Sequence, residues 1–158
     1  MERIDVLRRV EAFHALADDE LRAISRLSFE KNFARGDRLF RENDPAATLW
    51  IIAEGLIDLR FDLPGRETSA ENTISSLSAH QIIGWSSLLP PYAYKLSAYC
   101  ASDRCRMLAL DRDPFWDFLK KHPATGYPVM AALLQVVGKR FQALQDSADR
   151  PFRAGADG

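Results

Sequence analysis

The segment from Gly84 to Ser97, which we call the cassette, has residue types and spacing suited to binding an anion. A buried apolar run ends at Gly84, a short polar segment with Ser86 and Ser87 follows, and Lys95 then opens a strand. Backbone N–H groups at a helix start, with a glycine before them and a cation opposite, attract a phosphate-sized group. The alternative is a tight turn in which Gly84 supplies only backbone freedom. Spacing alone leaves both interpretations open.

The composition is that of one globular domain with a sizeable core. The chain has 158 residues, of which 47% are hydrophobic and 27% charged, with a net charge of -1. Because there is no basic excess to release counterions, a general nucleic-acid binder is not expected. No apolar run is long enough to cross a bilayer, and the first residues lack a signal-peptide core. We therefore expect a cytoplasmic protein without membrane contact.

Hydrophobic periodicity divides the chain into three parts. Helical spacing predicts helices in residues 1–27 and 111–148, and short alternating strands separated by turns fill residues 28–110. This order predicts a mainly β fold with flanking α elements: an antiparallel β-roll (a double-stranded β-helix, jelly-roll-like) with N-terminal helices and a long C-terminal helix. We expect residues 1–148 to form one domain and residues 149–158 a flexible tail.

The last predicted helix carries apolar residues alternately three and four residues apart. This spacing is typical of a coiled-coil seam and predicts a homodimer through the helix. The alternative is that the stripe packs on the roll of its own chain, in which case Leu133 and Val136 would widen it. The seam residues are Tyr127, Met130, Leu134, Val137, Phe141 and Leu144.

With these elements in place, the chain resembles the cyclic nucleotide-binding domains, in particular the sensor half of bacterial regulators of the catabolite-activator type. The resemblance covers residues 10 to 145. It is carried by Phe13 with Leu16 and Asp19-Glu20-Leu21, by segments 33–40 and 49–55, by Ile83-Gly84, and by Asp111 to Pro123. The resemblance implies a bacterial, regulatory role in signal transduction, without enzymatic activity.

The cassette departs from the pattern of the family it resembles. In that family the glycine is followed by a glutamate that holds the ribose 2′-hydroxyl. An arginine and a Ser or Thr further on hold the cyclic phosphate. Here Gly84 matches, Trp85 replaces the glutamate, Lys95 replaces the arginine, and Leu96 stands before Ser97 at the hydroxyl position. Lysine lacks the planar two-pronged fork of arginine. The combined losses predict a fall in cyclic AMP affinity of roughly two to four powers of ten.

Two functional hypotheses follow for the cassette. The first is a sensor for a cyclic nucleotide or another small anionic or aromatic ligand, since the polar residues of the cassette lie near four aromatic ones: Trp85, Tyr92, Tyr94 and Tyr99. Arg140 resembles a basic residue that some family members place near the base, the alternative being a solvated arginine. The second hypothesis is a roll filled by Trp85 that acts only as a dimerisation and protein-interaction scaffold. Either would act through a protein partner and not through direct DNA contact.

Catalytic and redox alternatives rest on few residues. A cupin-type metal enzyme needs clustered ligands, whereas His14, His80 and His122 lie in separate predicted elements. Cys100 and Cys105 flank the tip of a predicted hairpin and are expected to face each other across it. We expect two reduced, half-buried thiols, with a redox pair as the alternative.

Overall fold

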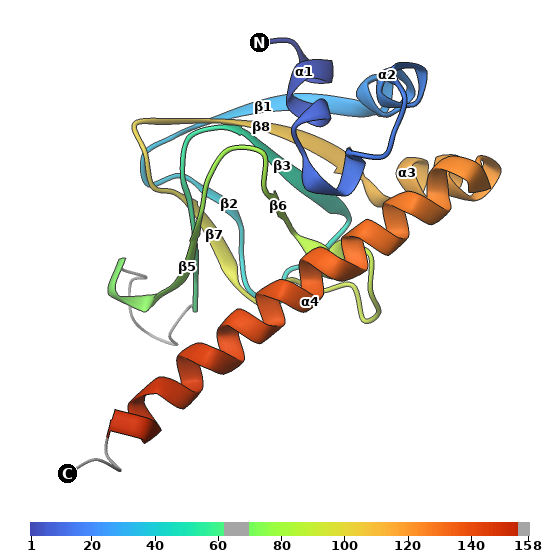
Figure 1. Cartoon of the computed structure of the whole chain (residues 1–158). Coiled ribbons are helices and arrows are strands. Elements are labelled where there is room, and N and C mark those ends of the chain that lie inside the picture. Colours follow the sequence, from blue (N-terminus) through green and yellow to red (C-terminus); the bar gives the residue numbers. More distant parts are fainter. Residues whose placement is uncertain (62–69, 155–158) are drawn as a thin grey trace.

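The computed structural model describes residues 1–61 and 70–154, without the side chains of Ala70, Leu144 and residues 147–154. Three short helical elements open the chain: α1 (Arg3–Arg8), the 3₁₀ turn η1 (Glu11–Phe13) and α2 (Asp18–Leu27). The buried apolar side chains of this N-terminal region are Val6, Leu7, Val10, Ala12, Phe13, Leu21 and Ile24. These residues join one apolar core with the inner strands of the neighbouring sheet, so the helices cover that sheet (Figure 1).

Within the described residues, the strands form two antiparallel sheets of four strands each. The first sheet has the order β1-β8-β3-β6, made by Ser28–Ala34, Arg104–Asp111, Thr48–Glu54 and Ile82–Ile83. The second has the order β2-β7-β4-β5, made by Arg38–Phe40, Ser97–Cys100, Ile57–Arg60 and Thr73–Leu77. Short turns, η2 (Ala70–Asn72) and η3 (Trp85–Ser87), precede β5 and follow β6. The predicted mainly β roll with flanking helices is confirmed.

The two faces of the first sheet enter two different cores, as β3 shows. Leu49 and Ile51 pack with the helices, whereas Trp50 and Ile52 point between the two sheets. Because both faces of β3 are buried, apolar residues occupy successive positions and not alternate ones. β6 pairs with β3, so the cassette that follows β6 begins at the junction of the two cores.

The predicted pairing of the segments around Ser102-Asp103 is wrong. β7 pairs with β2 and β4, whereas β8 pairs with β1 and β3, so these consecutive strands belong to different sheets. The short connection carries the chain from one sheet to the other, a step that local alternation of residues cannot distinguish from a hairpin.

Two helices follow the roll: α3 (Arg112–Lys121) and α4 (Pro123–Ala154). They meet at a sharp corner, where a Cβ on Gly126 would lie 2.5 Å from the carbonyl oxygen of Leu119. Only glycine allows this approach without displacement of the backbone.

The long helix α4 passes alongside the roll, and its C-terminal part extends beyond it (Figure 1). It begins at Pro123 and continues to Ala154. It therefore enters the segment predicted as a tail, of which residues 155–158 lie outside the described part. Among the described helices, none is long and apolar enough to cross a membrane.

Candidate functional site

Gly84 fixes the start of the cassette through its backbone conformation. Its φ is 83°, in the left-handed region, and it is the N-cap of η3. A Cβ here would lie 3.0 Å from the carbonyl oxygen of Thr48 and 3.3 Å from the Trp50 ring. The turn therefore brings the cassette backbone so close to β3 that only glycine fits at this position without displacing its neighbours.

Trp85 and Arg140 are the two predicted ligand residues that the structure brings together. The half-buried Trp85 packs on the core shared with the helices. The guanidinium carbon of Arg140 lies 5.5 Å from the centroid of its ring, within cation–π range. The indole Nε1 of Trp85 is buried and has no hydrogen-bond partner within the described part of the chain. The side chain that replaces the expected glutamate thus connects the cassette to α4.

The other predicted ligand residues differ in exposure. Lys95 is exposed and forms no ion pair within residues 1–61 and 70–154, and Leu96 is half-buried. The hydroxyl of Ser97 accepts a hydrogen bond from the backbone N–H of Glu42 at 2.8 Å. In η3, Ser86 is half-buried, and the Ser87 hydroxyl is buried without a partner among the described residues.

Arg140 lies in an environment that disfavours its charge. Burial lowers its pKa to about 10, an effect that the charge of Glu11 partly offsets. Glu11 accepts a hydrogen bond from Lys139 at 2.7 Å, and this bond lowers the pKa of the Glu11 carboxyl. These three side chains line a cavity of about 170 Å³, together with His80 and neighbouring apolar residues. The cavity combines two cations and one carboxylate beside the cassette-to-α4 contact.

Aromatic side chains fill the space between the sheets next to Gly84. The rings of Phe40 and Tyr94 stack with centroids 3.8 Å apart, and Phe33 contacts Trp50 edge-on at 6.0 Å. The Tyr94 hydroxyl donates to the carbonyl of Thr48 at 2.8 Å and lies 3.4 Å from the indole nitrogen of Trp50. We call Phe33, Phe40, Trp50 and Tyr94 the aromatic cluster.

Three members of this cluster, Phe33, Phe40 and Trp50, were not predicted from the sequence to belong to the site, whereas Tyr94 was placed near it. Trp50 and the buried Ile52 lie two positions apart in β3, so their side chains point to the same face of the strand. This spacing could have indicated from the sequence that Trp50 points into the space between the sheets. The rings of the other two tyrosines named for the cassette lie against guanidinium groups: Tyr92 lies under that of Arg112, and Tyr99 lies under that of Arg60.

Arg112, at the start of α3, also holds the cassette. Its guanidinium donates to the carbonyl of Ala46 at 2.8 Å and to that of Ser87 at 3.3 Å. The same group lies 4.3 Å from the centroid of the Tyr92 ring. The cassette is therefore connected to both C-terminal helices, through Arg112 to α3 and through Trp85 to α4.

The predicted seam on α4 is split between solvent and a groove. Tyr127, Leu134 and Phe141 are exposed by 80%, 74% and 61%, so they do not pack on the roll of their own chain. Met130 and Val137 are half-buried. An apolar groove of about 160 Å³ adjoins the seam and is lined by Trp85, Leu88, Leu89, Trp116, Met130, Leu133, Leu134 and Val137. The side chain of Leu144 lies outside the described residues.

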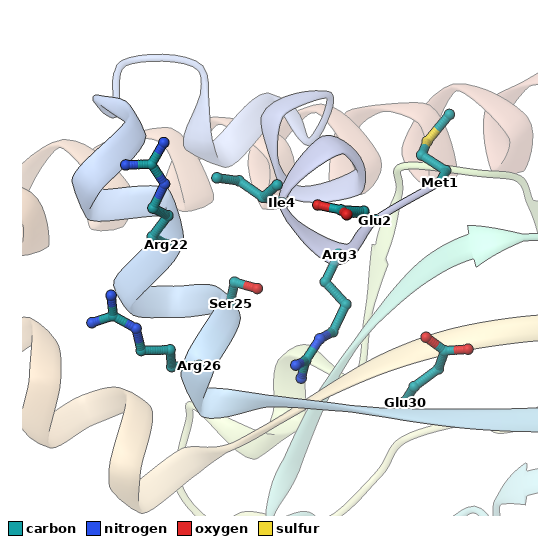
Figure 2. A pocket seen from close by; sticks show the side chains of 8 residues that line it. All are labelled: Met1, Glu2, Arg3, Ile4, Arg22, Ser25, Arg26 and Glu30. Atoms are coloured by element: carbon teal, nitrogen blue, oxygen red, sulfur yellow. The ribbon is translucent and has the colours of Figure 1, made fainter.

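A larger cavity lies on another part of the molecule and contains none of the predicted site residues. Its volume is about 500 Å³, and it lies between α1, α2 and β1. Arginine side chains from α1 and α2 line it, with Glu30 on β1 at its edge (Figure 2). Within the described ranges there is no group of three or more His, Cys, Asp or Glu side chains that could hold a metal.

Comparison with known proteins gives consistent relatives. A sequence profile described as "Cyclic nucleotide-binding domain" matches residues 30–122. The cGMP-dependent protein kinase, isozyme 2 forms cD5/T2, of Drosophila melanogaster is 30% identical over 115 residues, which are 72% of this chain and 12% of the kinase. The chain thus spans only a small part of that curated relative.

Solved structures match over most of the chain. A putative cyclic nucleotide-binding protein from Geobacter metallireducens GS-15 is 28% identical with a TM-score of 0.73, covering 89% of this chain and 99% of that one. The N-terminal domain of a transcriptional regulator from Streptomyces coelicolor A3(2) is 28% identical with a TM-score of 0.71, covering 89% and 95%. The Thermus thermophilus catabolite activator protein shares the fold at 24% identity with a TM-score of 0.71, covering 88% and 62%.

Proposed function

Because the chain belongs to the cyclic nucleotide-binding domain family, we propose that it is a non-enzymatic regulatory module with a rebuilt cassette. In this module Trp85 holds the cassette against α4, and tight binding of cyclic AMP is lost. The observation that carries the proposal is the contact of Trp85 with Arg140, at the position where the family pattern has a carboxylate. An indole has no acceptor for a ribose hydroxyl.

Two further features support the loss of tight binding. Lys95 is exposed, so a phosphate bound there would stay in water, where a single ammonium group contributes little. The aromatic cluster occupies the space between the sheets beside Gly84, so a ligand would have to displace stacked rings to enter it. Both features lower the expected affinity for cyclic AMP, as do the departures from the family pattern at positions 85, 95 and 96.

We assign the output of the module to protein contacts made by a dimer. Three large apolar side chains repeat along one face of α4 and are exposed: Tyr127, Leu134 and Phe141. Pairing with the same face of a second copy would remove them from water, and this burial is the main source of coiled-coil stability. We place the dimer in the cytoplasm, with residues 1–148 as its domain and a protein partner as its target.

Calorimetry with cyclic AMP and cyclic GMP tests the loss of binding. We expect no heat of binding at micromolar nucleotide, because each lost bond to a charged group removes about 1.5–3 kcal/mol. The matched variant Trp85→Glu/Lys95→Arg/Leu96→Ser restores the family pattern. If this variant binds the nucleotide, the loss of binding is caused by the three cassette substitutions alone. If it does not bind, the aromatic cluster contributes to the loss as well. Micromolar binding by the natural chain would refute the proposal.

A sensor for a different ligand is the second candidate. It is favoured by two buried polar atoms of the cassette without partners in the described structure, Trp85 Nε1 and Ser87 Oγ. A small molecule with a hydrogen-bond acceptor and an anionic group would satisfy the indole N–H and Arg140 together. A thermal-shift screen of cyclic mono- and dinucleotides and aromatic metabolites tests this candidate. A hit that Arg140→Leu or Lys95→Ala abolishes would support the sensor over the scaffold.

A further inference from the structure

The sulfur atoms of Cys100 and Cys105 are in direct contact inside the roll. Their Sγ atoms lie 2.6 Å apart, and both residues are buried, with exposures of 1% and 0%. The two residues are close in sequence but lie in different sheets, because Cys100 ends β7 and Cys105 lies near the start of β8. The contact therefore joins the two sheets at the point where the chain crosses between them.

The surroundings leave the sulfurs little room to separate. Around Cys105, the carbonyl oxygen of Leu56 lies 3.1 Å from Sγ, and the Ser102 hydroxyl lies 3.3 Å away. A Cβ on Gly55 would lie 2.9 Å from the same sulfur. On the other side, Sγ of Cys100 lies 3.3 Å from the Ser102 carbonyl. The fold thus holds the pair together from both sides.

We propose that Cys100 and Cys105 form a reversible intrachain disulfide that links the two sheets of the roll. The partner reagent is a small-molecule disulfide of the glutathione class. One protein thiolate attacks the reagent, which forms a mixed disulfide and releases one thiolate of the reagent. The second protein thiolate then attacks the protein sulfur of the mixed disulfide and releases the other. Two protein thiols are oxidised, one small disulfide is reduced to two thiols, and the two protein protons pass to water or to the released thiolates.

The same enclosure controls the rate of the reaction. Burial is the main cause that raises the pKa of Cys100 to about 11, with the adjacent Cys105 thiol adding to it. Few Cys100 thiolates exist at neutral pH, so exchange needs an opening of the connection between β7 and β8, whose residue Asp103 is exposed. The disulfide is therefore expected to form slowly, and faster as the pH rises.

Equilibration with defined ratios of reduced and oxidised glutathione tests the proposal. The reaction is quenched with acid, free thiols are alkylated, and intact mass counts the remaining thiols. The same measurement in concentrated urea gives the reference for the unfolded chain. Because the fold holds the sulfurs in contact, we expect the equilibrium constant for the disulfide to be at least roughly tenfold larger in the folded protein. By linkage, the oxidised form should then melt roughly 3–6 °C above the reduced form.

Single-cysteine variants provide the controls. Cys100→Ala and Cys105→Ala should each lose the oxidised species, with folding checked by circular dichroism. A folded-state constant no larger than the urea value would overturn the proposal, since the fold would then oppose the bond. Accumulation of a glutathione adduct in the natural chain, without the intrachain disulfide, would overturn it as well.

Discussion

Trp85 stabilises the fold through the contacts of its ring and not through its indole nitrogen. The ring contacts the core of the helices and faces the guanidinium of Arg140, whereas the indole Nε1 is buried without a partner among the described residues. A buried N–H without a partner is destabilising by about 1–3 kcal/mol. The residue thus combines a favourable apolar contact with an unfavourable polar one, and the two can be separated by substitution.

We predict that Trp85→Phe lowers the free energy of unfolding by less than about 1 kcal/mol, because it removes the unsatisfied N–H and keeps an aromatic ring. Trp85→Ala, which also removes the ring, should lower it by roughly 2–4 kcal/mol. Urea unfolding measures both. A loss in the phenylalanine variant as large as that in the alanine variant would contradict this separation of the two contributions.

His80, which lines the cavity beside Arg140, makes the stability of the folded chain depend on pH. Burial, and then the charge of Arg9, lower its pKa below the ordinary value of 6.5. The unfolded chain therefore takes up a proton before the folded chain does. The resulting stability is fully present above 6.5 and is lost as the pH falls through the lowered pKa of the folded state.

We predict that His80→Asn removes part of the loss of stability between pH 7 and pH 5, roughly the range below the ordinary histidine pKa. Asparagine is the suitable replacement because His80 has a φ of 72°, and asparagine tolerates the left-handed region. Urea midpoints at a series of pH values provide the measurement. Identical pH profiles for the two proteins would contradict the assignment to His80.

At the scale of elements, α4 presents two apolar faces with different partners. Val129 and Leu133 are buried on the core of their own chain, whereas Tyr127, Leu134 and Phe141 are exposed. A single amphipathic stripe needs only one such face. The second face is the physical basis for the proposed dimer.

We predict that Leu134→Glu dissociates the dimer without unfolding the chain, because Leu134 is 74% exposed in the single chain. Buried in a seam, the new charges would repel each other and lose their hydration. Analytical ultracentrifugation should show at least a roughly tenfold weaker association, equal to about 1.4 kcal/mol. Gln135→Glu adds the same charge at an exposed neighbouring position and should leave association unchanged. If both variants self-associate as strongly as the natural chain does, this face of α4 is not the dimer interface.

The element boundaries were largely predictable, whereas one pairing was not. The change from helical to alternating spacing after Leu27 and the return to helical spacing after Asp111 both appear in the structure. The crossing between β7 and β8 could not be predicted, because residues 101–103 have the composition of an ordinary hairpin turn. Which sheet each strand joins depends on distant partners, such as Phe33 opposite Cys105.

At the scale of the whole molecule, the roll brings together segments that are far apart in the chain, and local sequence patterns do not predict these contacts. The aromatic cluster combines residues of β1, β2 and β3 with Tyr94 of the cassette, and the stacking of Phe40 on Tyr94 joins segments far apart in the chain. Residue types at positions 85, 95 and 96 predicted a changed cassette. Only the folded arrangement places Trp85 on Arg140 and leaves Lys95 in solvent.

The central claim, that the cassette contacts α4 instead of a cyclic nucleotide, is tested most directly by the indole N–H resonance of Trp85 in a ¹H–¹⁵N spectrum. Trp85→Phe assigns the resonance among the indole signals. During titration with cyclic AMP or cyclic GMP to micromolar excess over the protein, we predict that its position does not change. A saturable shift of the Trp85 resonance at micromolar nucleotide would contradict the account.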